Sequence, residues 1–151
     1  MAEMSESKIS DRETDGQTGG QASRGVSGHV ILVTGAASGL GLADSKMLVE
    51  QGARVVMTDI DEERGRSLAS ELDAVFFHQD VADEGRWADI MTAVEAGFGR
   101  LDGLVNNAGI APIADIETTS TATWRSTLAI HLDAAFFGCR AGIKLMKENG
   151  G

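Results

Sequence analysis

A glycine-rich stretch from Thr34 to Gly41, with the sequence TGAASGLG, constrains the fold of this chain more than any other feature. The apolar run from Val30 to Val33 precedes it, and a helical pattern from Leu40 to Val49 follows it. A strand, a glycine-rich turn and a helix in this order present unpaired N–H groups and the positive end of the helix dipole to an anion, typically a phosphate. On its own, the same stretch is also compatible with an ordinary loop.

The three glycines of this stretch have separate expected roles. Gly35 allows a sharp turn at the end of the strand. Gly39 lets the backbone approach a pyrophosphate without an intervening Cβ, and Gly41 lets the helix lie close to the strand. The pattern therefore predicts a nucleotide site if other parts of the chain supply further contacts.

The composition excludes several classes of protein. A chain of 151 residues is long enough for one domain with a core, and its formal net charge of −10 disfavours nucleic acid or an anionic membrane surface as a partner. The single cysteine, Cys139, excludes an internal disulfide framework and fits a reducing compartment. No apolar run approaches the roughly 20 residues that span a bilayer, and the N-terminus lacks the apolar segment of a signal peptide. We expect a soluble cytoplasmic protein.

The first 27 residues differ from the rest of the chain. They are polar, with scattered charges and glycines and no periodic apolar pattern. Such a segment buries too little apolar surface to offset its ordering entropy, so residues 1–27 are predicted to be a disordered tail. A partner-binding or targeting arm is the alternative.

From Gly28 onward, strand and helix patterns alternate, which implies parallel pairing with right-handed crossovers. The predicted fold is α/β, a Rossmann-type doubly wound parallel sheet in the order 3-2-1-4 with flanking helices and a ligand crevice between strands one and four. Strands are expected over 29–33, 54–58, 74–78 and 102–106, and helices over 38–51, 61–72, 83–98 and 121–147. In the first helix, the residues expected to face the sheet are Leu40, Ala43, Met47 and Leu48.

Asp59 is the second element of the predicted site. It ends the second strand, close to the spacing of about 20 residues expected after a nucleotide-binding glycine turn. A carboxylate at this place accepts hydrogen bonds from a ribose 2′-hydroxyl and repels a 2′-phosphate, and the glycine-rich stretch contains no Arg or Lys to offset that repulsion. The sequence therefore favours NAD over NADP. Alternatively, Asp59 caps the following helix, although Asp61 can do this instead.

Two further signals end the third and fourth strands. Asp80 and Val81 combine a carboxylate with an apolar side chain, which suits the amino edge and the ring of an adenine; a capping role for Asp80 is equally compatible with the spacing. The run Asn106-Asn107-Ala108-Gly109 supplies small residues that let the backbone approach a ligand, and asparagine amides that can join neighbouring loops.

Together, these four motifs resemble the short-chain dehydrogenase/reductase family over about residues 28–151. The glycine stretch matches the family's Thr-Gly-x-x-x-Gly-x-Gly loop, Asp59 its NAD-selecting acid, and residues 106–109 its Asn-Asn-Ala-Gly motif. The sequence from Trp124 to Met146 most resembles that of bacterial NAD-dependent alcohol and hydroxysteroid dehydrogenases of this family. The resemblance implies an NAD-binding domain over 28–151. Its expected cofactor contacts are Gly35, Ser38, Gly39, Leu40, Gly41, Asp59, Ile60, Asp80, Val81, Asn107, Ala108 and Gly109.

The chain departs from this family at the positions that perform its chemistry. The family uses Asn, Ser and a Tyr-x-x-x-Lys pair, whereas this sequence has no tyrosine and no serine after Ser126. Where the family has its Asn, the chain has His131. This histidine is the candidate catalytic residue, either as a hydrogen-bond donor in place of Asn or as a base; a packed histidine within an apolar helix is the alternative. No metal site is expected.

These departures lead to an expectation about the whole chain. It carries the cofactor-binding half of an NAD-dependent oxidoreductase acting on a secondary alcohol or ketone, and it stops before the fifth strand, so it is not expected to turn over substrate efficiently by itself. The alternative is a non-catalytic nucleotide-binding or protein-interaction module. The last predicted helix is apolar on two sides, and strand four is an open edge; we therefore expect an exposed apolar patch and a homo-oligomer formed through this helix.

Overall fold

The four predicted strands form one parallel sheet in the order β3-β2-β1-β4, which confirms the predicted fold class. The computed structural model describes residues 25–148, so nearly all of the predicted tail lies outside the described residues. The strands are β1 (Val30–Thr34), β2 (Arg54–Asp59), β3 (Val75–His78) and β4 (Gly103–Val105). The helices are α1 (Gly39–Glu50), α2 (Glu62–Glu71), α3 (Glu84–Phe98), α4 (Thr121–Leu128), the π-helical turn η1 (Ala129–Asp133) and α5 (Ala134–Glu148).

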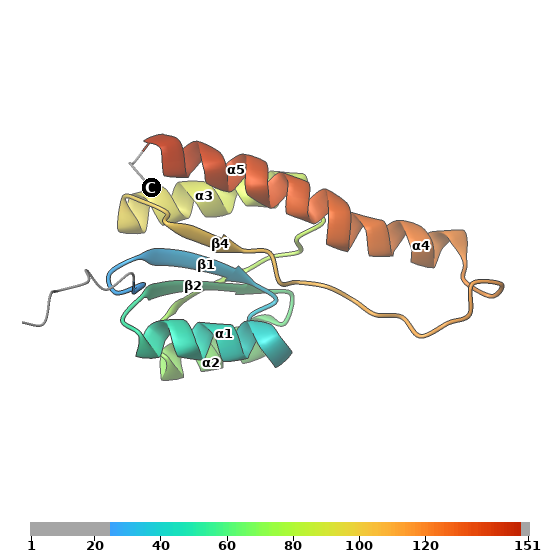
Figure 1. Ribbon diagram of the computed structural model, residues 1–151, viewed down its shortest axis with the longest axis horizontal. Helices are drawn as coiled ribbons and strands as arrows, with labels where there is room; N and C mark the ends of the chain where they lie inside the picture. Colours follow the sequence, from blue (N-terminus) through green and yellow to red (C-terminus); the bar gives the residue numbers. More distant parts are fainter. Residues whose placement is uncertain (1–24, 149–151) are drawn as a thin grey trace, which may run out of the picture.

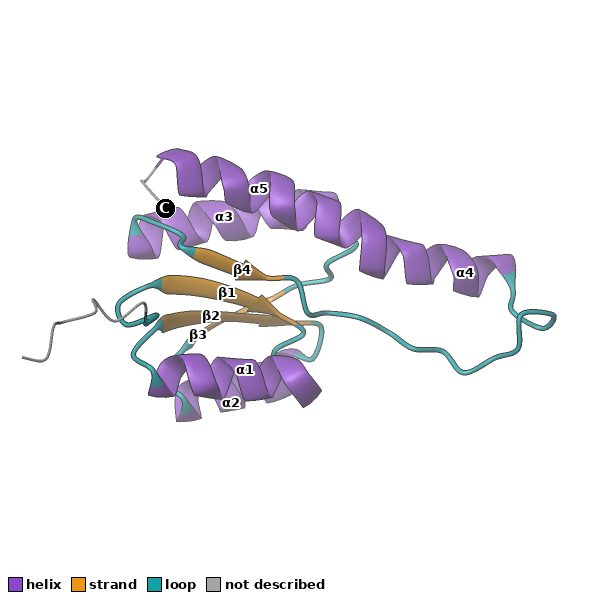
Figure 2. Ribbon diagram, in the orientation of Figure 1, coloured by secondary structure: helices purple, strands orange, loops and turns teal. Residues whose placement is uncertain are grey.

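Helices cover both faces of the sheet, as Figures 1 and 2 show: α1 and α2 lie on one face, and α3 and α5 lie on the other. Alternate residues of a strand point to opposite faces, and every residue of β1 is buried. Val30 and Leu32 therefore join the core under α3 and α5, whereas Ile31 and Val33 join the core under α1 and α2. These two cores explain why the strand is apolar at every position.

The predicted inner face of α1 is partly wrong. Leu48 packs in the core, but Ala43 is exposed, Leu40 is 77% exposed and Met47 is 51% exposed. The helix approaches the sheet through its small residues Gly41 and Ser45, both of which are buried. The face of α1 toward the sheet therefore runs through Gly41 and Ser45, and Leu40 lies exposed at the end of the sheet that carries the strand C-termini.

The last predicted helix is interrupted. Residues 121–148 form a continuous helical path, but a π-helical turn, η1, separates α4 from α5 and contains His131. The helix face that includes Ile130, Phe137 and Leu145 packs against the sheet and α3. The opposite face stays open, and Figure 1 shows α4 and the preceding loop extending beyond the sheet. Large exposed apolar side chains on this segment are Trp124, Leu132, Phe136 and Ile143.

Asp102, which directly precedes β4, binds the backbone at the start of β1. Its Oδ2 accepts a hydrogen bond from the Val30 N–H at 2.8 Å, and Arg100 pairs with the same carboxylate. Burial by itself raises the pKa of Asp102, but the hydrogen bonds from the Arg100 guanidinium and the Val30 N–H outweigh it and leave that pKa below its usual value.

Within residues 25–148, no helix is both long and apolar enough to cross a membrane.

The contact between α2 and β3 gives a test of the packing. A Cβ at Gly65 would lie 2.0 Å from the Phe76 ring, whereas a Cβ at Gly97, also within a helix, meets nothing within 4 Å. Gly65→Ala is expected to lower the free energy of unfolding by about 1–2 kcal/mol, because overpacking exceeds the gain in helix propensity. Gly97→Ala is expected to raise it by up to about 1 kcal/mol. Urea unfolding of both variants measures the difference, and equal stabilisation by the two would contradict this packing.

Candidate functional site

The C-terminal ends of the strands surround a pocket of about 500 Å³. It lies at the crevice between β1 and β4 and extends across the ends of β2 and β3, where open parallel sheets bind ligands. All of the predicted cofactor contacts except Gly41 line it. The lining residues are Gly35, Ser38, Gly39, Leu40, Asp59, Ile60, Gln79, Asp80, Val81, Asn107, Ala108, Gly109, Ile110 and Ile130.

The N-terminus of α1 opens toward this pocket without a side-chain cap. Ser38 stands at the N-cap but makes no capping hydrogen bond, and the first turn has no acidic residue. By contrast, α2, α3 and α4 are capped by Asp61, Asp83 and Ser120. The first N–H groups and the positive end of the α1 dipole are thus left for an external anion.

Gly35 and Gly41 bring the glycine-rich stretch against the end of β4. Gly35 has a φ of +65°, and a Cβ there would lie 2.8 Å from the Ala108 Cα. A Cβ at Gly41 would lie 2.3 Å from the Gly35 carbonyl oxygen and 2.4 Å from the Asn107 Nδ2. Gly41 therefore supports the site through packing behind the loop. At Gly39, which faces the pocket, a Cβ would meet nothing within 4 Å, so the backbone there is open to a ligand.

Thr34 joins the ends of β1 and β4 through one buried hydroxyl. Its Oγ1 accepts hydrogen bonds from the N–H groups of Asn107 and Ala108, each at 3.0 Å, and donates to the Val105 carbonyl at 3.3 Å. The Asn107 amide in turn donates to the carbonyls of Thr34, at 2.9 Å, and Gly35, at 3.2 Å. Because a hydroxyl has one donor and two acceptor positions, Thr34 is fully satisfied by this arrangement.

Asp59 joins β2 to the glycine-rich stretch. One carboxylate oxygen accepts from the Ala37 N–H at 2.9 Å, and the other accepts from the Asp61 N–H at 3.0 Å. The capping of α2 falls to Asp61, which accepts from the Arg64 N–H at 3.1 Å. Two carboxylate oxygens offer about four acceptor positions, so Asp59 retains capacity for hydroxyl donors in the pocket.

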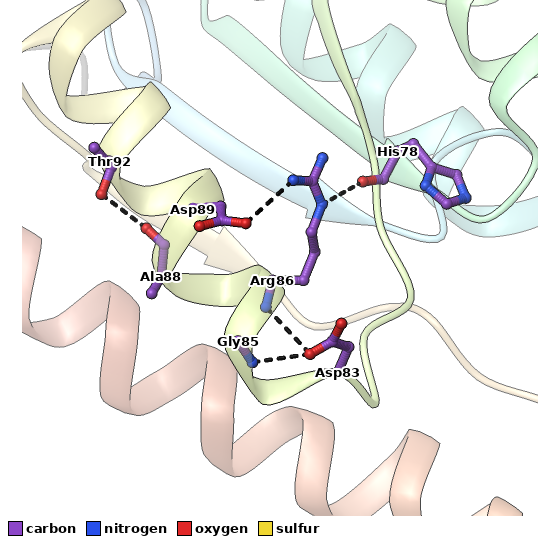
Figure 3. A network of polar contacts seen from close by, with 7 residues as sticks. All are labelled: His78, Asp83, Gly85, Arg86, Ala88, Asp89 and Thr92. Atoms are coloured by element: carbon purple, nitrogen blue, oxygen red, sulfur yellow. Dashed lines mark hydrogen bonds and ion pairs between the residues drawn. The ribbon is translucent and has the colours of Figure 1, made fainter.

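The segment after β3 is held by α3 and by a hydrogen bond of its own. The Trp87 indole N–H donates to the Val81 carbonyl at 2.9 Å, and the Ala82 N–H donates to the Asp80 carboxylate at 2.9 Å. Figure 3 shows the adjoining network, in which the Arg86 Nε donates to the His78 carbonyl at 3.0 Å while Asp83 caps α3. These bonds hold both sides of the Asp80–Val81 segment that lines the pocket.

The pocket also contains residues that the sequence analysis did not identify. Gln79, Ile110 and Ile130 line it. Gln79 and Ile110 are direct neighbours of the predicted residues Asp80 and Gly109, so their position in the sequence could have identified them. Ile130 comes from η1, more than 20 residues after the nearest motif, and only the tertiary fold brings it to the strand ends.

The candidate catalytic residue His131 lies beside this pocket and does not line it. It borders a smaller cavity of about 100 Å³ that shares Val81, Asn107, Ala108 and Ile130 with the larger pocket. The His131 Nε2 is 3.0 Å from the Ile110 nitrogen and 2.7 Å from the Ile110 oxygen. The ring is therefore engaged with the backbone after β4.

The chemistry of the pocket suits a dinucleotide. An uncapped helix N-terminus fits a pyrophosphate, and the exposed apolar side chains of Leu40 and Ile60 flank the opening. Among the described lining residues, the only charged groups are the carboxylates of Asp59 and Asp80. Within residues 25–148, no group of three or more His, Cys, Asp or Glu side chains is arranged to hold a metal ion.

The Thr34 network leads to a test with a matched pair. Thr34→Val keeps the shape of the side chain but leaves the Ala108 N–H without its acceptor. It also removes one of the two acceptors of the Asn107 N–H, which donates to the Val105 carbonyl at 3.0 Å as well. It is expected to lower the free energy of unfolding by about 2 kcal/mol, whereas Thr34→Ser, which keeps the hydroxyl, should cost less than about 1 kcal/mol. Chemical denaturation measures both. Equal losses for the two variants would show that the hydroxyl network contributes little.

Comparison with known proteins agrees with this geometry. The family model described as short chain dehydrogenase matches residues 29–151. A 3-beta-hydroxysteroid dehydrogenase from Comamonas testosteroni is 44% identical over 126 residues, which span 82% of this chain and 50% of that protein. An NADP-dependent (R)-specific alcohol dehydrogenase from Lentilactobacillus kefiri is 40% identical over 127 residues, with the same coverage. A D-threitol dehydrogenase from Mycolicibacterium smegmatis is 43% identical over 129 residues, again 82% of this chain and 50% of the relative.

The chain thus spans about half the length of the curated relatives it matches. The matched region contains every element that surrounds the pocket, from β1 to α5. Sequence motifs, sheet order and relatives all agree, and the chain belongs to the short-chain dehydrogenase family.

Proposed function

We propose that this chain binds NAD in the pocket at the strand ends. The observation that carries the proposal is the convergence of the uncapped α1 N-terminus, Asp59 and Asp80 on that one pocket. The pyrophosphate is assigned to the glycine-rich stretch, the adenosine ribose to Asp59, the adenine to Asp80 and Val81, and the middle of the cofactor to residues 107–109. A bound nicotinamide cofactor supplies hydride transfer, and the residues of the pocket bind and orient it.

The preference for NAD over NADP rests on charge. Asp59 is half-buried at the pocket edge, and no Lys or Arg is among the described residues that line the pocket. A 2′-phosphate in this place would meet a carboxylate with no cation to offset the repulsion. The relative from L. kefiri is NADP-dependent, so membership of the family does not by itself select the cofactor.

For the whole protein, we propose NAD-dependent interconversion of a secondary alcohol and a ketone in the cytoplasm. The relatives act, by their names, on hydroxysteroids and alcohols. The 151 residues contain no tyrosine, and so they hold no counterpart of the family's Tyr-x-x-x-Lys pair. We therefore expect the chain to bind cofactor without efficient turnover.

The exposed apolar face of the last helix favours a second candidate, a nucleotide-binding or interaction module without catalysis. The coding sequence downstream of the codon for Gly151 distinguishes the two. A Ser-bearing strand followed by Tyr-x-x-x-Lys, in frame or after one frameshift, supports the enzyme; a stop codon with no such remnant supports the module.

The Asp59 assignment is tested by comparing two nucleotides. Asp59 also holds the Ala37 N–H, so a variant at this position disturbs the loop as well as any ribose contact. The ratio of NADPH to NADH dissociation constants separates the two effects, because loop damage weakens both nucleotides alike. Asp59→Asn is expected to reduce this ratio by about tenfold or more, since a charge-assisted hydrogen bond and a repulsion are both removed.

Asp80→Asn is the matched control for this titration, because it removes the other carboxylate of the pocket near a part that NADH and NADPH share. It should change both dissociation constants by the same factor. If Asp59→Asn also weakens both nucleotides equally, Asp59 is a loop anchor only, and the ribose assignment is wrong.

We further propose that the open face of α5 and η1 joins a second copy of the chain. Leu132, Phe136 and Ile143 lie on one helical face and are 62%, 58% and 49% exposed. β4 is an outer strand of the described sheet, and α5 packs against it, so an exposed apolar face adjoins an open edge.

Self-association is expected to depend on this face. Sedimentation of the wild-type chain should show a dimer or larger species, and the double variant Leu132→Lys/Ile143→Lys should be monomeric because charged side chains replace the apolar contacts. Met47→Lys, at an exposed apolar position on the opposite layer, should leave association unchanged. A wild-type chain that stays monomeric at high concentration would contradict the proposal.

A further inference from the structure

β3 is an outer strand of the described sheet, and its backbone groups alternate between two sides. Asp59 is the register partner of His78, and its carbonyl accepts the Gln79 N–H at 2.9 Å. Every second residue of a parallel strand bonds to the same neighbour, so Phe77 and Gln79 turn their N–H and carbonyl groups toward β2. The N–H and carbonyl groups of Phe76 and His78 therefore form the outer edge of the sheet.

The sequence of β3 does little to protect this edge. Residues 74–79, AVFFHQ, contain no Asp, Glu, Lys, Arg or Pro, and both valine and phenylalanine favour strands. Natural sheets protect outer strands with charges, prolines or bulges, because their unpaired N–H and carbonyl groups can pair with another chain. Among the described residues, no partner donates to the Phe76 carbonyl or accepts from the Phe76 and His78 N–H groups.

Arg86 reaches this edge from α3. Its Nε donates to the His78 carbonyl at 3.0 Å, and its Nη1 lies 3.4 Å from the Asp89 Oδ2; Figure 3 shows both contacts. On the α2 side, the hydrogen bond from Arg66 lowers the pKa of the Glu62 carboxyl, and the charges of His78 and Arg86 lower it further. Charged side chains from two helices thus gather at the end of a strand that has no Asp, Glu, Lys or Arg of its own.

The edge geometry defines the partner that Arg86 excludes. A second copy of β3, placed antiparallel about a two-fold axis at Phe77, would set Phe76 of each copy opposite His78 of the other. In each such pair, the His78 carbonyl accepts the Phe76 N–H, and the Phe76 carbonyl accepts the His78 N–H. The Arg86 guanidinium already occupies the His78 carbonyl, where the incoming N–H would bind.

We propose that Arg86 blocks the outer edge of β3 and thereby prevents two copies of the chain from joining their sheets there. Nucleotide binding has no part in this block. Association through the open face of α5 is also separate from it, because α5 packs against β4, at the other edge of the sheet.

The block is tested in the full 151-residue chain with Leu132→Lys and Ile143→Lys, which suppress association through α5. Arg86→Met removes the guanidinium but keeps a long unbranched side chain. It is expected to sediment as a dimer, and its Phe76 and His78 amides should exchange with deuterium about tenfold more slowly at high than at low concentration. Arg86→Lys, which keeps a donor on a long side chain, should dimerise less.

Arg66→Met is the matched control, since it removes an equal charge from an arginine that pairs with Glu62 on its own helix. It should stay monomeric, with both amides exchanging fast at every concentration. Adding His78→Pro to Arg86→Met removes one outward N–H at a position where an edge strand tolerates proline, and it should abolish the dimer.

Two results would overturn the proposal. One is an Arg86→Met chain whose sedimentation and amide exchange match those of Arg66→Met. The other is a dimer that His78→Pro leaves intact, which would place the contact elsewhere. If the two lysine substitutions leave association through α5 in place, exchange of the Phe76 and His78 amides still reports pairing at β3 directly.

Discussion

The hydroxyl of Thr34 is the interaction on which the arrangement of the site depends. It is buried at the end of β1 and accepts hydrogen bonds from two successive N–H groups after β4, which keeps the two strand ends together where the chain reverses its order across the sheet. Gly35 and Gly41 lie against Asn107 at this junction, where a Cβ on either glycine would be 3.0 Å or less from the Asn107 Nδ2. The glycine-rich stretch, first recognised as a sequence pattern, is therefore half of a contact whose other half is the Asn-Asn-Ala-Gly run.

Hydrogen bonds from side chains to loop backbones also hold the other parts of the pocket. Asp59 binds the Ala37 N–H, Trp87 binds the Val81 carbonyl, and His131 binds the backbone of Ile110. In every case a side chain from one element fixes a loop backbone of another. The N-terminus of α1 is the exception, since its N-cap serine leaves the first N–H groups unbound by any side chain. The pocket thus has loops held by hydrogen bonds and one helix N-terminus whose N–H groups bind no side chain, which is the arrangement expected of an anion site.

The order of strands and the residues at their ends could be predicted because both follow from local patterns. Apolar runs set the strands, and motifs at their C-termini must meet at one edge of a parallel sheet. The exposure of Leu40 and Met47 could not be predicted, because α1 buries its small residues Gly41 and Ser45 against the sheet and not the apolar stripe that its sequence presents. The π-helical turn at His131 could not be predicted either, because the apolar periodicity of the sequence continues through it. Ile130 reaches the pocket only through that turn, so it was missed as well.

Amide chemical-shift mapping tests most directly whether the pocket at the strand ends binds NAD, as we propose. Titration of the isotope-labelled chain with NADH is expected to shift resonances saturably at residues 35–41, 59–60, 80–81 and 107–109. A larger groove of about 690 Å³ lies between α3 and α5, lined by Trp87, Arg140 and Lys144 among others, and serves as an internal control. Shifts confined to that groove, or no shifts at the strand ends at saturating NADH, would contradict NAD binding in this pocket.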